Sequence, residues 1–230
     1  MDEIDTNQSK YARWTPPLAS RAARKVAVAN RGSYKGERVV AKGPSRILKI
    51  DSYGEYLSGL CIEYEASVAE IAEQLPPVGY HDADGVVKKH YFDLGATLHD
   101  GRRRVYAVKP KRRAAETDFE AELALVAGQW PDGFADQAFL VTEEHYDPID
   151  VFNAKLQHGM RDPELEADAA ALAVVSAMAE AKTLGELVAE IGLDGQGYRA
   201  LVRLITAGVL VLRHRERIGY ASVVDRGVSE

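Results

Sequence analysis

The chain changes its pattern at residues 160–167 (MRDPELEA), a charged stretch that contains Pro163. Before this stretch, helix-like and strand-like segments alternate; after it come three helical segments and a strand hairpin. A proline in a charged stretch disfavours one continuous helix across it. The sequence therefore predicts two domains, at residues 19–160 and 161–230. A polar arm with paired prolines, expected to be flexible, precedes them at residues 1–18.

The first domain is predicted to have a mixed α/β fold. Apolar residues from Tyr56 to Tyr64 recur at helical spacing, and Ser52 and Glu55 before them have the spacing of a capping box. Helices and strands are expected to alternate along the rest of this domain, which is typical of a mixed α/β fold. We expect strands at 45–51 and 68–80, a turn at 81–85, a hairpin around 99–101, a helix at 117–130, a strand at 138–144 and a helix from 148 to about 160.

The second domain has the element order of a winged helix-turn-helix. An alanine-rich helix is expected at about 163–181, a short helix after the capping-box pair Thr183 and Glu186, a third helix at 197–207, and then a hairpin. The residues at recognition-helix or wing positions that are candidates for DNA contact are Gln196, Tyr198, Arg199, Arg203, Arg213, Arg215 and Arg217. Because this domain is acidic overall, an architectural or partner-binding role is favoured.

Charge and cysteine content exclude several classes of protein. The single cysteine excludes a disulfide-stapled scaffold, and no apolar run approaches the ~20 residues of a membrane span. A soluble, cytoplasmic protein is expected. Residues 1–115 hold 20 Lys/Arg and 14 Asp/Glu, a net charge of +6, and residues 116–230 carry a net −12. A phosphate-binding surface is therefore expected mainly in the first half, although ordinary charge scatter explains the balance equally well.

Three side chains in the first domain suggest phosphodiester chemistry. Glu55 lies near a helix start, Asp93 on the first strand of the hairpin and Lys109 on the second strand. This is the usual layout of restriction-type nucleases. Two carboxylates can hold Mg²⁺ or Mn²⁺, the metal polarises the phosphate and lowers the pKa of a bound water, and the lysine orients that water or steadies negative charge.

Each of these residues also has a purely structural interpretation. Glu55 can simply cap its helix, Asp93 can face solvent, and Lys109 starts a basic run and can be an ordinary surface charge. Their combination and the order of the elements carry the hypothesis. The motif HDADG at 81–85 begins like a calcium loop but lacks the later ligands, so a turn is predicted there.

The chain resembles the TnsA-type endonuclease subunit of heteromeric transposases. The resemblance rests on YLSGLCIEYEASVAEIAEQLP, YFDLGATLHDG, YAVKP and FLVTEEHYDPIDVFNAKLQ, and it continues through the winged-helix pattern, from about residue 44 onward. It implies a restriction-endonuclease-like (PD-(D/E)xK) mixed-sheet core followed by a C-terminal winged-helix domain. It also implies a metal-dependent enzyme that cuts one DNA strand at transposon ends, with an integrase-type transposase and an ATP-dependent regulator as partners.

The resemblance also implies roles for individual residues. Glu55 matches the family's helix glutamate, Asp93 its metal-binding aspartate and Lys109 its catalytic lysine, while Gln74 matches the glutamine of its Glu-Gln motif. Two residues before the lysine the family carries Gln, but this chain has Ala107. Alanine cannot bind a metal and is expected to leave room for water, so Gln or Glu at this position is expected to strengthen metal binding.

A basic set flanks the two hairpin strands and is expected to neutralise phosphates beside the site. Its members are Arg102, Arg103, Arg104, Lys111, Arg112 and Arg113. Two other functions stay open at this point. Ala107 favours a catalytically inert relative that binds DNA or assembles the complex. A winged-helix transcription regulator would instead need a closed apolar ligand pocket in the first domain.

Overall fold

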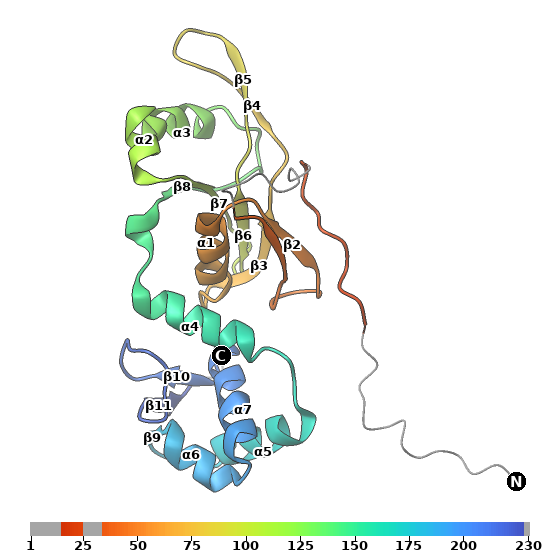
Figure 1. Cartoon of the computed structure of the whole chain (residues 1–230), viewed down its shortest axis with the longest axis vertical. Coiled ribbons are helices and arrows are strands. Elements are labelled where there is room, and N and C mark those ends of the chain that lie inside the picture. Colours follow the sequence, from red (N-terminus) through yellow and green to blue (C-terminus); the bar gives the residue numbers. More distant parts are fainter. Residues whose placement is uncertain (1–14, 25–33, 228–230) are drawn as a thin grey trace, which may run out of the picture.

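A computed structural model describes residues 15–24 and 34–227, and its first domain is built on a mixed four-stranded sheet (Figure 1). The strand order is β3-β6-β7-β8; β6 pairs antiparallel with β3 and β7, and β8 runs parallel to β7. The strands are β3 (Val68–Glu73), β6 (Leu94–Leu98), β7 (Arg103–Val108) and β8 (Gln137–Val141). The parallel β8 needs a long crossover from β7, which two helices supply.

Helices cover both faces of this sheet. Helix α1 (Tyr53–Glu63) contacts β3, β6 and β7, and α2 (Lys111–Glu116) and α3 (Phe119–Ala127) form the crossover. Side chains alternate along β7, as the pleat of a strand requires. Tyr106 packs in the apolar cluster shared with α1, whereas Val105 and Ala107 pack in the cluster shared with α3.

Two of the predicted strands are divided. The strand expected at 68–80 is β3 followed by β4 (Val78–His81), and the first hairpin strand is β5 (Val87–His90) followed by β6. Gln74 has a φ of 44°, and Pro76 and Pro77 follow it, so the first strand cannot continue. Strands β4 and β5 pair with each other and project from the sheet in Figure 1. Because of these breaks, the central sheet ends at Gln74 and Asp93, and β4 and β5 form a separate pair.

Most local signals are confirmed. Helix α1 begins after Ser52, whose hydroxyl accepts from the Glu55 N–H (3.1 Å), and α4 (Pro148–Gly159) begins after Asp147 with proline in its first turn. Residues 82–85 form the expected turn. Helix α2 was not predicted, because its sequence KRRAAE has no apolar period. Upstream, β1 (Gly36–Val39) and β2 (Ile47–Ile50) form an antiparallel pair.

The second domain contains three helices and a small antiparallel sheet of order β10-β11-β9. Its elements are α5 (Leu165–Ser176), β9 (Lys182–Thr183), α6 (Leu184–Ile191), α7 (Asp194–Thr206), β10 (Leu210–Leu212) and β11 (Val223–Arg226). The capping box predicted at Thr183 and Glu186 is present. The first helix is shorter than predicted, because the chain leaves the helix at Ala177 and turns to enter β9.

Helix α4 joins the two domains. It packs on α1 and on α7, and the Asn153 side chain bonds the Glu216 carbonyl and the Ile218 N–H, both at 2.8 Å. Of the predicted N-terminal arm, residues 1–14 lie outside the described part. Leu18 forms a parallel bridge with Arg46 beside β2. No helix in the described part of the chain is long and apolar enough to cross a membrane.

Candidate functional site

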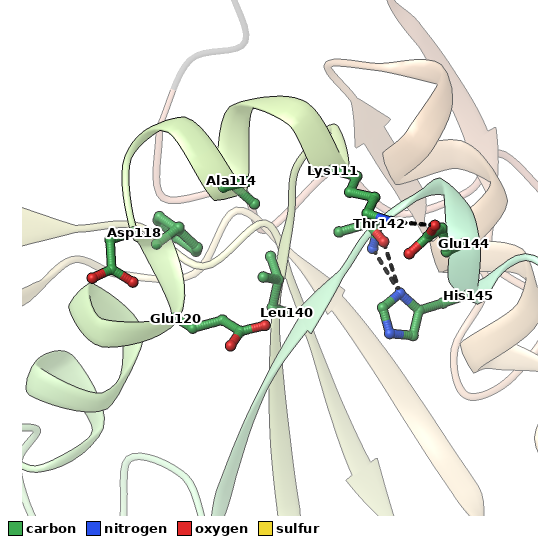
Figure 2. A pocket seen from close by; sticks show the side chains of 10 residues that line it. Lys111, Ala114, Asp118, Glu120, Leu140, Thr142, Glu144 and His145 are labelled. Carbon is green, nitrogen blue, oxygen red and sulfur yellow. Dashed lines mark hydrogen bonds and ion pairs between the residues drawn. The ribbon is translucent and has the colours of Figure 1, made fainter.

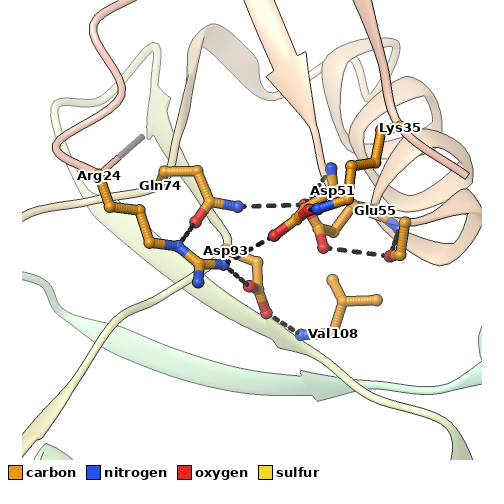
Figure 3. Close-up of polar contacts among 8 residues, drawn as sticks. Arg24, Lys35, Asp51, Glu55, Gln74, Asp93 and Val108 are labelled. Atoms are coloured by element: carbon orange, nitrogen blue, oxygen red, sulfur yellow. Dashed lines mark hydrogen bonds and ion pairs between the residues drawn. The ribbon is translucent and has the colours of Figure 1, made fainter. Parts of the chain in front are cut away.

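The candidate site lies at one end of the central sheet, where five elements meet (Figure 3). Gln74 follows β3, Asp93 directly precedes β6 and Val108 ends β7. Asp51 follows β2, and Glu55 lies in the first turn of α1. The carboxylates of Glu55 and Asp93 are almost completely buried, with residue exposures of 7% and 9%. Buried carboxylates need partners, and the contacts around these two define the site.

Glu55 acts both in capping its helix and in the polar cluster. One carboxylate oxygen accepts from the Ser52 hydroxyl, and the other accepts from the Asp51 N–H and from the Gln74 amide, each at 3.1 Å. The pKa of Glu55 is nevertheless raised to about 7, first by burial and then by the negative charge of Asp93. Gln74 and Arg24 connect the two carboxylates, since Gln74 donates to Glu55 and accepts from Arg24, which lies 3.8 Å from Asp93.

Asp93 continues the strand pairing with its side chain. Its Oδ2 accepts from the Val108 N–H at 2.8 Å, one residue before β6 begins. Burial raises the pKa of Asp93, while the Val108 N–H and the positive charges of Lys109 and Arg24 oppose this shift. The side chain is thus fixed at the end of the sheet. It does not face solvent, so the purely structural interpretation of Asp93 does not hold.

Gln74 connects Glu55 to a cation. Its side chain is fully buried, and its backbone lies in the left-handed region. The amide donates to Glu55, and the amide oxygen accepts from the Arg24 guanidinium. The guanidinium also lies 3.5 Å from Asp51 and 3.8 Å from Asp93, and Lys35 pairs with Asp51. Arg24 therefore lies between Asp51 and Asp93, whereas Glu55 has only neutral hydrogen-bond donors.

Lys109 lies beside this cluster. It directly follows β7, and its positive charge acts on Asp93. Its ammonium lies 4.6 Å from the ring centroid of Phe119 on α3. The face of an aromatic ring attracts an ammonium group, so this contact helps to hold the lysine side chain in place. The structure thus brings Glu55, Gln74 and Asp93 together and places Lys109 at their edge.

The carboxylates of the site are oxygen donors of the kind that hard divalent cations prefer. Among residues 15–24 and 34–227, no group of three or more His, Cys, Asp or Glu side chains is arranged to hold a metal ion. Glu55 and Asp93 supply two carboxylates, and their mutual repulsion is what a dication would relieve. Mg²⁺ is commonly held by one or two carboxylates with several waters, so this pair fits it.

Ala107 does not lie in open space. It is 1% exposed and packs in the apolar cluster that includes Phe119. The expectation that this alanine leaves room for water is therefore wrong, because α3 fills the space beside it. A longer polar side chain would have to enter an apolar core.

The basic set is divided between two places. Arg102, Arg103 and Arg104 lie at the turn between β6 and β7, and Val108 is five residues further along β7 than Arg103, a distance of about 17 Å. The expectation that these three lie beside the site is wrong, because the hairpin's turn and its open end are at opposite ends of the strands. Their side chains contact Asp100, the Gly133 carbonyl and Glu65, respectively.

The other three basic residues begin α2, immediately after Lys109. Lys111 pairs with Glu144 at the rim of a pocket between α2, α3 and β8, in which His145 bonds Thr142 (Figure 2). Arg112 pairs with Glu116 along the exposed helix. Arg113 is exposed. These three side chains remain the candidates for phosphate contacts near the site.

The candidate arginines of the second domain face acidic groups of the protein. Arg199 makes two hydrogen bonds with Glu164 (2.6 and 3.0 Å), and the Arg203 Nε bonds Asp168 (2.8 Å). Arg215, between β10 and β11, reaches Asp150 at the start of α4. The remaining candidates are also engaged: Arg213 pairs with Asp225, Arg217 lies over the Phe152 ring, and Tyr198 stacks on Tyr220, whereas Gln196 is exposed.

Sequence reasoning missed two members of the site, Arg24 and Asp51. Asp51 directly precedes the capping residue Ser52, so its closeness to Glu55 was readable from the sequence. Arg24 lies 50 residues before Gln74, in a basic segment with no periodic pattern. No local signal identifies such a contact. Searches against protein-family models and curated proteins found no match for this chain.

Proposed function

We propose that the chain is a Mg²⁺- or Mn²⁺-dependent DNA endonuclease with a restriction-type core and a C-terminal winged-helix domain. By the resemblance, it would be the subunit of a heteromeric transposase that cuts one strand at transposon ends. The observation that carries the proposal is the pair of buried, mutually repelling carboxylates, Glu55 and Asp93, beside Lys109. A buried pair of this kind costs stability, and cation binding is a function that would explain its presence.

The element order supports this core. Helix α1 delivers Glu55, Asp93 directly precedes β6, and β7 leads into Lys109. The helical crossover then returns the chain to β8, parallel to β7. An acid and a lysine on adjacent strands, preceded by a glutamate on a helix, form the layout of restriction-type nucleases. The order α5-β9-α6-α7-β10-β11 likewise supports a winged helix.

Each residue of the site would have a distinct role in the reaction. Glu55 and Asp93 would hold the metal, which when bound would polarise the scissile phosphate and lower the pKa of a water. Gln74 and the Val108 N–H orient the two carboxylates. Lys109 would steady negative charge on the phosphate or position the attacking water. Lys111, Arg112 and Arg113 would contact flanking phosphates of double-stranded DNA.

Nicking of supercoiled plasmid in Mn²⁺, with the wild-type chain and Asp93→Asn, tests this proposal. Asp100→Asn is the matched control, because it removes a carboxylate from the far end of the same hairpin. Asp93→Asn should abolish both nicking and Mn²⁺ binding by calorimetry, and Asp100→Asn should change neither. If Asp93→Asn nicked the plasmid as well as wild type does, the assignment would be overturned.

Ala107 favours a second candidate, a catalytically inert relative that binds DNA or assembles the complex. This chain lacks a carboxylate or amide two residues before Lys109. Mn²⁺ binding that depends on Asp93, without any nicking in the presence of partner subunits, would support this candidate over the nuclease.

A further inference from the structure

The guanidinium of Arg24 occupies the centre of the candidate site (Figure 3). It donates to the Gln74 amide oxygen and lies 3.5 Å from Asp51 and 3.8 Å from Asp93. Its charge is one of the influences that counter the burial of Asp93. A protein cation therefore lies where the proposed function requires a divalent one.

Arg24 is delivered to this position by a fixed stretch of chain. Before it, the Leu18 N–H donates to the Ser45 carbonyl and the Leu18 carbonyl accepts from Ile47, each at 2.9 Å. The Ala23 N–H donates to the Gln74 carbonyl at 2.8 Å, one residue before the arginine. These main-chain bonds hold the segment along the sheet edge. The placement of Arg24 is therefore part of the fold.

The contacts of the guanidinium differ in kind. Its hydrogen bond is to a neutral amide, whereas its distances to the two carboxylates exceed those of ordinary charged hydrogen bonds. Asp51 has a second cation in Lys35, but Asp93 has only Arg24 and the neighbouring Lys109 charge among the described residues. The ion pair with Asp93 can thus be released while Gln74 still anchors the arginine.

We propose that Arg24 is the resident counter-ion of this site, which competes with the divalent cation for Asp93 and must withdraw when the cation binds. The proposal rests on the proposed function, since it concerns the same carboxylate pair. Like charges repel, and Asp93 is buried, so Arg24 and a dication cannot both neutralise Asp93 at full strength. Because Gln74 bonds both Arg24 and Glu55, movement of the arginine would also reorient the second carboxylate.

The test is Mn²⁺ binding by calorimetry to wild type, Arg24→Gln and Arg24→Lys. Arg21→Gln is the matched control, because Arg21 lies in the same segment and pairs with Glu70 at the surface. Arg24→Gln should bind Mn²⁺ about 10-fold more tightly or more. Arg24→Lys, which keeps the charge, should stay closer to wild type, and Arg21→Gln should remain within about 2-fold.

Unchanged or weaker binding by Arg24→Gln, with its circular dichroism spectrum intact, would overturn the inference. Adding Asp93→Asn to each variant separates this failure from that of the proposed function. If Asp93→Asn abolishes Mn²⁺ binding in the wild-type background but Arg24→Gln has no effect, only the counter-ion inference fails. If Asp93→Asn leaves binding unchanged, the metal lies elsewhere, and both the inference and the metal assignment fail.

Discussion

Charged residues are used in opposite ways in the two domains. In the second domain, Arg199 bonds Glu164 through two nitrogens, and this contact lowers the pKa of the glutamate. At the sheet end of the first domain, burial and mutual repulsion raise the pKa of Glu55, and burial raises that of Asp93. The same residue types are thus matched with partners in one region and left short of positive charge in the other.

This difference separates a structural surface from a binding site. Matched pairs hold α5 against α7 and the β10–β11 connection against α4, so their arginines are engaged within the protein. Helix α7 also contacts α4 and bonds Gln157 through Thr206. The architectural role favoured by the acidity of the second domain stays a prediction. The unmatched carboxylates are the groups suited to take up an external cation.

Lys109 should produce the largest effect. We expect Lys109→Met to reduce Mn²⁺-dependent nicking by about 10³-fold, because the developing charge on the phosphate would lose its donor. Mn²⁺ affinity should change little. Lys182→Met, which removes a lysine paired with Glu190 in the second domain, is the control and should nick like wild type. Equal nicking by both variants would remove Lys109 from the chemistry.

Glu55 should make stability depend on pH. Its pKa is about 7 in the folded protein and near 4.5 in the unfolded chain. Between these values the unfolded chain loses the proton that the folded protein keeps, so this group lowers stability as pH rises from about 4.5 to 7. We expect Glu55→Gln to remove a loss of about 3 kcal/mol across this window.

Urea unfolding at pH 5 and pH 7 measures this effect, with Glu70→Gln on the exposed side of β3 as the control. If stability changed between pH 5 and pH 7 by the same amount in Glu55→Gln as in wild type, the shift could not be assigned to Glu55.

Arg203 should contribute to the stability of the fold and not to catalysis or DNA binding. Arg203→Met keeps much of the side-chain volume but removes the hydrogen bonds to Asp168 and the Met160 carbonyl. We expect a loss of about 2 kcal/mol of unfolding free energy, because both acceptors lose a charged donor. The exposed pair of Arg213 and Asp225 provides the control, and Arg213→Gln should have little effect. DNA binding that falls without a change in stability would assign Arg203 to DNA instead.

The smallest expected change concerns salt. If the start of α2 contacts phosphates, Arg113→Gln should reduce the slope of log affinity against log salt by about one unit, as one lost phosphate contact predicts. Arg199→Gln should leave the slope unchanged, since Arg199 is bound to Glu164. Fluorescence anisotropy of a labelled duplex across salt concentrations measures both slopes. Identical slopes in wild type and Arg113→Gln would exclude this contact.

Local chemistry was readable from the sequence, and long-range placement was not. The caps at Ser52, Asp147 and Thr183 were predicted because each depends on residues within one turn. Glu55 and Asp93 were found through residue type and order. The position of Arg24 depends on contacts across about 50 residues, which no local pattern encodes.

Two sequence-based predictions failed for geometric reasons. Arg102, Arg103 and Arg104 are close in sequence to the site, but a hairpin places its turn at the far end of its strands. Ala107 does lie on the same strand face as Val105, as the alternation of side chains requires, but α3 closes that face. Neither the length of the strands nor the packing of the crossover helix was visible from residue spacing alone.

The central claim is that Glu55 and Asp93 form a divalent-cation site. Anomalous diffraction from crystals soaked in Mn²⁺ tests it most directly, because it locates the ion without relying on activity. The account predicts one anomalous peak within about 2.5 Å of carboxylate oxygens of both residues, with the Arg24 guanidinium moved away from Asp93. Mn²⁺ bound elsewhere, with Arg24 still in contact with Asp93, would contradict it.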